Sequence, residues 1–491
     1  MGSRVAHRPR RVSASAARVA ALGVLGEVRR RDARARDLMR RSESLSRLDA
    51  RDKGMAERLV LGVVATSGRL DAALGAYLAR PGSLEPRVRD ALRVSAFELM
   101  YLGTPGAVAV SQGVELVRGV APRACGLANA VLRRVAEKDA PLVAEARARV
   151  EDASADACDL ALVAGWPEWL ARGLACSLGV PACCEMAACA LEPAPVWVSG
   201  NAALHPADEV PVMLRAAGLD PRPTGLAGTW VLPSAAGLAA SGLVTSADVV
   251  VSDMAARLVA RIASPAPASR VLEVGQGRAT KTLLLEEAAI GQGGACDITG
   301  VDSVGYKSGV ARARLVHGLA DHTRCLTLDA RLLGDVDSCE PVGIARDDAF
   351  DLVFVDAPCT GTGTMRRHPE IVWGLGRESS SELAELQLQI LRAASARVRV
   401  SGSLVFSTCS VLDEEDVRVV DSFLASDEGR AFALADVREA PLVEKDASVL
   451  ELVSPHVDER GMFRSHPRAG SFDGHFCARF VRVGQLRRPC G

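Results

Sequence analysis

Apolar residues recur with a helical period through the first third of the chain. The first predicted helix carries one apolar stripe, with arginines at other positions, formed by Ala17, Val19, Leu22, Val24, Leu25 and Val28. Segments 57–74 and 87–102 repeat this pattern, and segment 112–138 is typical of two helices separated at Pro122. Since nothing here alternates as a strand does, we predict an all-α domain over residues 15–145.

The pattern changes to short apolar runs alternating with helices from about Asp253 onward. The runs expected to be strands are 269–274, 297–303, 325–330, 350–358 and 402–410, with a long helix over 383–398. This alternation predicts a doubly wound, largely parallel α/β domain over residues 251–486. Between the two domains, residues 146–250 are expected to form linker helices and a small mixed α+β subdomain.

Composition supports a folded, multidomain protein with an uneven charge. The 491 residues are 48% hydrophobic and 24% charged, which excludes wholesale disorder. The net charge is only −1, but residues 1–140 carry 26 Lys and Arg against 14 Asp and Glu, and the remainder carries 33 against 46. A basic N-terminal third, which begins with a basic tail at residues 1–14, indicates a module that binds a polyanion.

The cysteines and the apolar stretches indicate in which cellular compartment the protein is expected. The 13 cysteines include no C-x-x-C pair, so we expect neither a zinc site nor a disulfide framework, and no metal is predicted. The first forty residues show no secretory signal, and the longest uncharged stretch is interrupted by Gly, Pro, Ser and Thr. These features favour a cytoplasmic protein without a membrane span.

A nucleoside site is predicted where the first strand of the α/β domain meets its helix. The strand leads into Glu273-x-Gly275-x-Gly277, a turn whose backbone N–H groups can approach a ligand closely. The second strand ends at Asp302, where a carboxylate can bind both ribose hydroxyls, and the third ends at Asp329, near an adenine edge. The alternative is a generic α/β turn with two surface carboxylates.

Two cysteines follow two later strands of the same domain. The run FVDAPCTGTG (354–363) delivers Asp356 and Cys359 to one strand end, and LVFSTCS (404–410) delivers Cys409 to another. Because parallel strands end at one edge of a sheet, we expect both thiols at the edge where open α/β sheets bind ligands.

Two thiols, a carboxylate and a nucleoside pocket together suggest a reaction. A thiolate that adds to carbon 6 of a pyrimidine makes carbon 5 nucleophilic enough to attack an electrophilic methyl group. A carboxylic acid at the N3 edge would stabilise the developing charge, and a second group must later remove the carbon-5 proton.

These motifs resemble a known family. The runs DAPCTGTGTMRRHPEIVW (356–373) and FSTCSVLDEED (406–416) are similar to those of the NOL1/NOP2/Sun RNA cytosine-carbon-5 methyltransferases. The basic helical segment, with LDARDKGMAERLVLGVV (48–64) and NAVLRR (129–134), resembles a NusB-type RNA-binding domain. Together they resemble the bacterial Sun/Fmu (RsmB) branch, and DGHFCARF (473–480) is similar to the closing strand of the family.

The resemblance implies a role for each matching residue. Cys409 matches the nucleophile, Cys359 the cysteine assigned to product release, and Asp356 the acid that contacts the target base and borders the cofactor. Asp302 and Asp329 fall where the family binds S-adenosylmethionine, and Lys281 matches a lysine that lines cofactor and active site. It implies methyl transfer to carbon 5 of a cytosine in 16S rRNA, with the free rRNA or a partially assembled small ribosomal subunit as partner. We also expect a monomer.

The cofactor loop departs from the family pattern D-x-C-A-A-P-G-G-K-T. The residues expected to bind the cofactor here are Glu273, Gly275, Gln276, Gly277, Arg278, Ala279, Thr280 and Lys281, with Asp302, Asp329 and Asp356. We interpret the change as a re-formed loop, and weakened cofactor binding is the alternative. A second departure is VWVSGN (196–201), which lacks the arginine of the family's R-x-N.

The basic residues after the Cys359 loop are the predicted RNA contacts of the α/β domain, namely Arg366, Arg367 and His368, and a solvated loop is the alternative. Two other functions remain open. One is the same chemistry on tRNA, against which the NusB-like domain argues. The other is a catalytically degenerate ribosome-assembly or antitermination factor, favoured only by the altered cofactor loop.

Overall fold

The computed structural model describes residues 13–31, 34–137, 141–235, 237–316, 318–319 and 321–484. The chain forms two compact units. The helical unit comprises Met1–Glu192 and Met365–Gly376, and the sheet unit comprises Pro193–Thr364 and Arg377–Gly491. The predicted segment 146–250 is therefore divided between them, and the predicted tail over 1–14 lies almost wholly outside the described residues.

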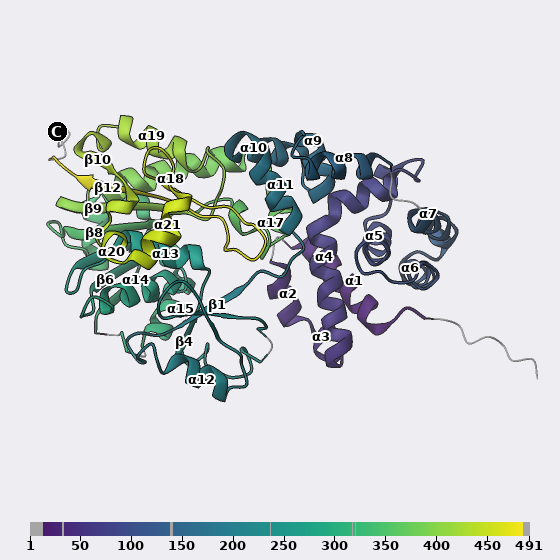
Figure 1. Ribbon diagram of the computed structural model, residues 1–491, viewed down its shortest axis with the longest axis horizontal. Coiled ribbons are helices and arrows are strands. Elements are labelled where there is room, and N and C mark those ends of the chain that lie inside the picture. The colour runs from purple at the N-terminus through teal and green to yellow at the C-terminus, as the bar shows by residue number, and fades with distance from the viewer. Residues whose placement is uncertain are drawn as a thin grey trace, which may run out of the picture. The chain divides into compact units, whose positions relative to one another are not determined.

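The helical unit contains helices and no strand in its described part, which confirms the predicted all-α domain. Its helices, all seen in the purple-to-blue part of Figure 1 except α17, are α1 (Ala16–Arg30), α2 (Ala35–Arg41), α3 (Glu43–Ser46), α4 (Ala50–Gly75), α5 (Pro86–Tyr101), α6 (Gly106–Val120), α7 (Cys125–Glu137), α8 (Pro141–Glu151), α9 (Ala157–Ala164), α10 (Glu168–Leu178), α11 (Val180–Cys189) and α17 (Ile371–Gly374). The long α4 packs against α1, α5 and α9.

Local sequence accounts for these helices. Ser15 and Asp49 accept hydrogen bonds from backbone N–H groups at the starts of α1 and α4, as N-cap residues do. The buried face of α1 includes Ala17, Ala20, Ala21, Val24 and Leu25. Val19 does not belong to it and is 54% exposed, because two residues along a helix turn the side chain about 200° away from Ala17.

The sheet unit is built on a mixed eight-stranded sheet of order β10-β12-β9-β8-β5-β6-β7, with β11 paired to β12. Its strands are β5 (Arg270–Val274), β6 (Asp297–Asp302), β7 (Thr323–Thr327), β8 (Phe350–Asp356), β9 (Val398–Thr408), β10 (Phe432–Ala435), β11 (Phe463–Arg464) and β12 (Phe476–Arg482). The five strands from β9 to β7 pair in parallel, as predicted, whereas β12 joins β9 antiparallel.

Helices cover both faces of this sheet (Figure 1). One face packs against α13 (Met254–Ala263), α14 (Thr280–Ile290) and α15 (Gly305–Leu315), together with α20 (Pro441–Lys445) and α21 (Ala447–Val453). The other packs against α16 (Val336–Cys339), α18 (Ser379–Ser395) and α19 (Val417–Ala425). The predicted doubly wound α/β domain is therefore confirmed.

A small subdomain precedes this fold in the sheet unit. Its four strands are in the order β2-β3-β1-β4 and pair antiparallel, with bounds β1 (Val196–Gly200), β2 (Arg222–Pro223), β3 (Thr229–Leu232) and β4 (Val249–Val251), and α12 (Val210–Ala216) accompanies them. Within the described residues, no helix has both the length and the apolar character that crossing a membrane requires.

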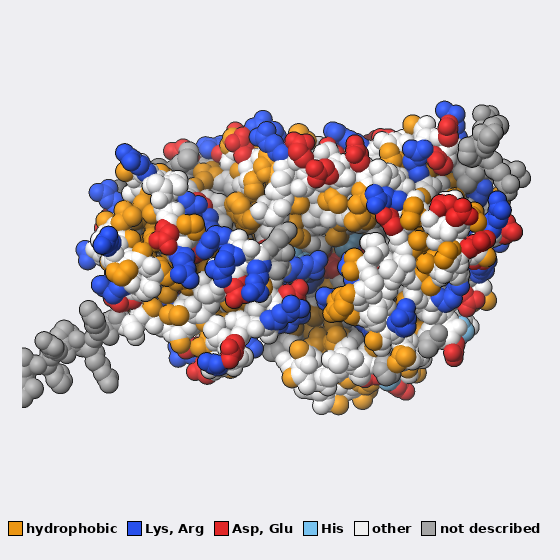
Figure 2. Space-filling model, turned by 180° about the vertical axis from the view of Figure 1, so that it is seen from behind, with side chains coloured by type: hydrophobic (Ala, Val, Ile, Leu, Met, Phe, Trp, Pro, Cys, Tyr) orange, Lys and Arg blue, Asp and Glu red, His pale blue; other side chains and the backbone are white. Residues whose placement is uncertain are grey.

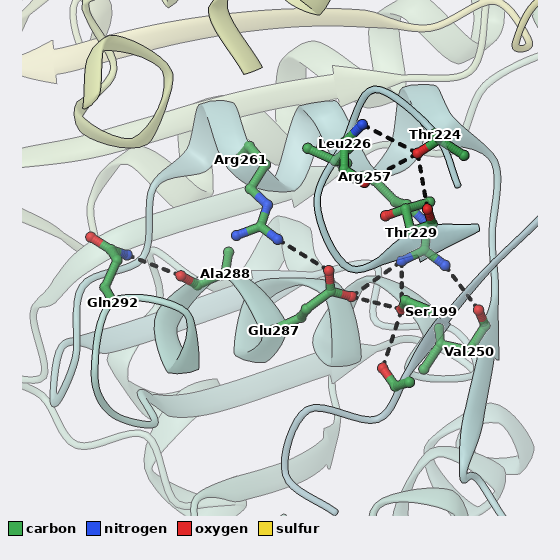
Figure 3. Close-up of polar contacts among 11 residues, drawn as sticks. Ser199, Thr224, Leu226, Thr229, Val250, Arg257, Arg261, Glu287, Ala288 and Gln292 are labelled. Carbon is green, nitrogen blue, oxygen red and sulfur yellow. Dashed lines mark hydrogen bonds and ion pairs between the residues drawn. The ribbon is translucent and has the colours of Figure 1, made fainter. Parts of the chain in front are cut away.

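One buried arginine joins the small subdomain to the elements of the eight-stranded sheet (Figure 3). Arg257 of α13 donates to Ser199 Oγ in β1 at 2.6 Å and to the Val250 carbonyl in β4 at 2.9 Å. It also lies 3.1 Å from the carboxylate of Glu287 in α14, which Arg261 contacts at the same distance on its other oxygen. Three elements therefore depend on one guanidinium group that water does not reach.

We predict that Arg257→Met lowers the free energy of unfolding of the sheet unit by about 3 kcal/mol, since it leaves buried acceptors without their donor. The matched variant Arg261→Met removes a partly buried partner that makes a single contact with the same carboxylate and should cost less, about 1 kcal/mol. Denaturant titration of both variants measures this difference, and equal losses would contradict the role given to Arg257.

Candidate active site

The two cysteines predicted at one sheet edge lie next to each other. Parallel pairing aligns Asp356 of β8 with Ser407 of β9, so both strands end at the same level. Just beyond them, Cys359 Sγ and Cys409 Sγ are 3.4 Å apart, and both residues are partly exposed. The structure therefore joins two thiols that are separated by 50 positions in the chain.

A buried glutamate fixes the two cysteine loops. Glu415 is fully buried and accepts hydrogen bonds from Thr360 N at 2.8 Å, Ser410 Oγ at 2.6 Å and Gln387 Nε2 at 3.1 Å. The Thr360 hydroxyl donates to it as well. Burial raises the pKa of Glu415, and the four donors oppose that rise. Sequence analysis did not single out Glu415, although it belongs to the FSTCSVLDEED run.

A glycine allows a third strand end to close on the same loops. Gly363 N donates to the Cys409 carbonyl, and Gly474 N donates to the Gly363 carbonyl, each at 2.9 Å. A Cβ at Gly363 would lie 2.2 Å from the Gly474 carbonyl oxygen, so only glycine fits this crossing. The loops after β8 and β9 are thus braced by the residues that lead into β12.

A lysine–carboxylate pair lies beside the thiols. Lys281 Nζ is 2.6 Å from Asp356 Oδ1. Burial alone would lower the pKa of Lys281, but the Asp356 carboxylate outweighs it and the pKa is raised. The ammonium charge therefore persists next to the cysteines.

The surroundings of the two thiols shift their pKa values in opposite directions. The hydrogen bond from Cys359 lowers the pKa of Cys409 against the effect of burial, and Lys281 lowers it further. The same hydrogen bond, with burial, raises the pKa of Cys359 well above its ordinary value. Of the two thiols, Cys409 is therefore the more acidic and Cys359 the one that holds its proton more tightly.

His475 also belongs to this edge and was missed by sequence analysis. It directly precedes β12, whose register pairs Phe476 with Thr408, the residue before Cys409, and the charges of Lys281 and Asp356 both act on its imidazole. It is 5% exposed, and burial followed by the charge of Lys281 lowers its pKa to about 4. The imidazole is therefore neutral at physiological pH. The sequence signal for His475 is the DGHF run (473–476), which the sequence analysis interpreted only as part of a closing strand.

The glycine turn after β5 reaches the same place. Gly275 has a φ of +82°, and a Cβ there would lie 2.2 Å from the carbonyl oxygen of Asp356. Gly277 N donates to Asp302 Oδ2 at 3.0 Å, and Val304 N donates to Oδ1 of the same carboxylate at 2.9 Å. The predicted turn, Asp302 and Asp356 are thus brought together.

Two other residues predicted to bind the cofactor, Glu273 and Gln276, are buried and stabilise the turn. Glu273 is fully buried, accepts from Thr282 Oγ1 at 2.6 Å, and has its pKa raised to about 8, chiefly by burial. Gln276 is buried too, and a Cβ at Gly300 would lie 2.0 Å from its amide nitrogen. The Gly300 position in β6 therefore makes room for the Gln276 side chain.

The remaining loop positions are ordered by α15. Arg314 Nη1 donates to the Arg278 carbonyl at 3.1 Å and to Thr280 Oγ1 at 3.0 Å. Ala279 is buried and has a φ of +61°, at the start of α14. The loop that departs from the family pattern is therefore a closed, hydrogen-bonded turn.

Asp329 and the predicted RNA-contact residues are not placed as the sequence analysis expected. Asp329 lies two residues after β7, and its carboxylate binds Arg331, with Oδ2 2.6 Å from Nη2, which lowers its pKa. Arg366 is buried, with 8% of its surface exposed, while Arg367 and His368 are half-buried. Burial of Arg366 does not favour the direct phosphate contact predicted for it, because little of its surface is open to a ligand.

Comparison with known proteins places this site in a family. The sequence model described as "16S rRNA methyltransferase RsmB/F" matches residues 307–481, and the "NusB family" model matches residues 15–137. Ribosomal RNA small subunit methyltransferase B of Thermus thermophilus is 30% identical over 466 residues, covering 95% of this chain and 98% of its own. The chain belongs to the RsmB/F family of 16S rRNA methyltransferases.

Other relatives agree with this family. The methyltransferase B of Xylella fastidiosa strain 9a5c is 31% identical over 386 residues, with 77% of this chain and 83% of its own covered. The fold of the solved protein PH0851 has a TM-score of 0.72 at 18% identity and covers 96% of this chain and 100% of that one. As an RsmB/F member, the protein is an RNA methyltransferase that depends on S-adenosylmethionine.

We predict that the pH dependence of Cys409 alkylation in this RsmB/F protein reports the pKa of the Cys409 thiol, which the hydrogen bond from Cys359 lowers. Cys359→Ala removes the donor, so the pKa of Cys409 rises and its alkylation curve moves to higher pH. Iodoacetamide labelling between pH 6 and 10, read by mass spectrometry of the Cys409 peptide, measures this. Cys176→Ala, at an exposed cysteine of the helical unit, is the control. A curve that stays or moves lower would contradict the assignment.

Proposed function

We propose that this protein methylates carbon 5 of a cytosine in 16S rRNA through a covalent bond between Cys409 and the pyrimidine ring. The observation that carries the proposal is the 3.4 Å separation of Cys359 Sγ and Cys409 Sγ beside the Lys281–Asp356 pair. A single partly exposed cysteine has many structural explanations. Two thiols with opposed pKa shifts at a ligand-binding sheet edge match a reaction that needs one nucleophile and one proton carrier.

The first step uses the lowered pKa of Cys409. Its sulfur forms a bond to carbon 6, and the electrons of the C5–C6 double bond move toward carbon 5 and the N3 edge of the ring. The Lys281–Asp356 pair holds a proton next to that edge and stabilises the developing charge. When bound, S-adenosylmethionine supplies the electrophilic methyl group that carbon 5 attacks.

Release of the product changes the role of Cys359. Once Cys409 is bonded to the ring, its negative charge is gone, and with it a large part of what raises the pKa of Cys359. Cys359 can then lose its proton to solvent, which reaches it because it is partly exposed. The new thiolate takes the carbon-5 proton, the C5–C6 double bond re-forms, and Cys409 leaves as a thiolate.

The backbone and carboxylate groups of the glycine turn are of the kind that could bind the methyl donor. Gly275 and Gly277 provide backbone that a ligand can approach closely, and Asp302 retains acceptor capacity for ribose hydroxyls beyond its two backbone hydrogen bonds. We propose that these residues, with Asp356 and Lys281, contact the cofactor. Glu273, Gln276 and Ala279 would act by keeping the turn in shape, and Asp329 would reach an adenine only if it left Arg331.

The relatives' names and the charge of the helical unit support an RNA substrate of this kind. The relatives of Thermus thermophilus and Xylella fastidiosa are named ribosomal RNA small subunit methyltransferases. Lys and Arg side chains gather over the helical unit on the face drawn in Figure 2. We propose that 16S rRNA, free or in a partially assembled small subunit, binds as an accessible single strand or with the target base extruded.

Two variants test the proposed chemistry. Cys409→Ala should abolish methyl transfer to a 16S rRNA transcript, by at least about 1,000-fold, because no enamine can form. Cys359→Ala should accumulate a protein–RNA adduct that survives denaturation, because the carbon-5 proton stays in place. Methyl incorporation and denaturing gels measure the two effects.

The control is Cys176→Ala, at an exposed thiol of the helical unit, which should behave as the unaltered protein. Activity of Cys409→Ala near that of the unaltered protein would exclude Cys409 as nucleophile. Normal turnover of Cys359→Ala without any adduct would exclude its role in release.

A further inference from the structure

Twelve residues that directly follow the Cys359 loop fold with the helical unit. The chain leaves the sheet unit after Thr364, contributes residues 365–376 to the helical unit, and returns at Arg377. This segment, called here the docked segment, contains the short helix α17 and the predicted RNA-contact residues. The two units are therefore joined at three points of the chain, one of them next to the candidate active site.

A tryptophan docks the segment on α4. Trp373 Nε1 donates to the Val64 carbonyl at 2.9 Å. A Cβ at Gly68, one turn further along α4, would lie 3.2 Å from the tryptophan ring, so the ring rests directly on the helix. The Val64 carbonyl already belongs to the helical hydrogen-bond ladder, and its second lone pair accepts from the indole.

An arginine of α2 holds the other end. Arg36 Nε donates to the Arg367 carbonyl at 3.1 Å. The two contacts together fix the docked segment at both ends against α2 and α4. Neither contact involves the catalytic thiols, and both lie within the helical unit.

These contacts bring positive charges together on an exposed surface. Arg36 is exposed, Arg367 is half-exposed, and the charges of Arg367 and Arg40 act unfavourably on that of Arg36. Carboxylates balance these charges locally, since Glu370 acts on Arg36 more strongly than Arg367 does, Glu57 acts more strongly than Arg40, and Asp37 pairs with Arg40.

The surrounding stretch keeps an excess of positive charge. Residues 34–58 carry eight Lys and Arg against five Asp and Glu. An excess of guanidinium charge on an exposed surface favours contact with a polyanion.

We infer that the docked segment is part of the RNA-binding surface of the helical unit, where Arg36 and Arg367 together contact one phosphate of the strand that leads to the target base. Trp373 acts as a positioning residue that keeps Arg367 beside Arg36. This inference rests on the proposed function for the identity of the RNA. Because the docked segment continues the Cys359 loop, RNA held here is close along the chain to the site of the reaction.

The docking is tested with Trp373→Phe, which keeps an aromatic ring and removes the N–H donor. Trypsin should then cleave the native protein after Arg367 about tenfold faster, because the segment leaves α4 more often. Trp230→Phe, the same change in β3 of the sheet unit, is the matched control and should leave this cleavage unchanged. Equal cleavage rates in Trp373→Phe and the unaltered protein would overturn the docking role.

The shared phosphate is tested with Arg36→Gln, Arg367→Gln and the double variant, using an unmethylated 16S rRNA transcript as probe. Each single variant should weaken RNA binding about fivefold and reduce the salt slope by about 0.7–0.9, as loss of one phosphate contact does. The double variant should lose clearly less than the product of the two, since both side chains serve one phosphate. Arg118→Gln on α6 is the control, with binding unchanged.

The outcomes separate this inference from the proposed function. Independent, multiplicative losses or unchanged RNA binding would overturn the shared contact, even if the unaltered protein methylates cytosine. Loss of binding in the expected pattern, together with no methylation at carbon 5, would leave the surface standing and remove only the proposed chemistry. For Trp373→Phe, the methylation kinetics should show a higher KM for RNA at an unchanged kcat. A fall in kcat at saturating RNA, without a rise in KM, would overturn the positioning role of Trp373.

Discussion

The parallel pairing of β8 with β9 is the constraint on which the rest of the site depends. It brings the ends of the two strands to one level, so that the loops that follow them meet. The loops then share one buried carboxylate, Glu415, which binds Thr360 from the first loop and Ser410 from the second. A buried carboxylate with several donors is costly to disturb, so the 3.4 Å distance between the sulfurs is a property of the fold rather than of two flexible side chains.

The short distance between the sulfurs also makes the two thiols, Cys359 and Cys409, differ in acidity. Two thiols so close cannot both ionise, since like charges repel and burial penalises each of them. The nearby ammonium of Lys281 favours the thiolate on Cys409. In the proposed reaction this asymmetry lasts only while Cys409 is free, because a covalent bond to the ring would remove its charge. In this account the same pair serves first as nucleophile and donor, and later as leaving group and base.

Much of this arrangement could be predicted from local patterns. Strand-like runs ending in Asp-Ala-Pro-Cys and Ser-Thr-Cys-Ser predict one sheet edge, because parallel strands share their carboxyl ends. Glu415 and Gln387 could not be recognised in this way, since their partners in the Cys359 loop lie 55 and 29 positions away in the chain. His475 was hidden for a similar reason, because only the antiparallel pairing of β12 with β9 brings the start of β12 to the strand end that precedes Cys409. Docking of Trp373 on α4 joins residues 309 positions apart, which no local period reveals.

The central claim is a covalent bond between Cys409 and carbon 6 of the target cytosine, and trapping that bond tests it most directly. A 16S rRNA transcript made with 5-fluorocytidine would be incubated with the protein and S-adenosylmethionine, since fluorine at carbon 5 cannot leave as a proton does. After digestion, mass spectrometry would identify the peptide attached to the nucleotide. The account predicts one methylated, fluorinated nucleotide attached to the peptide that contains Cys409. Attachment through Cys359, or methylated RNA with no attached peptide, would contradict it.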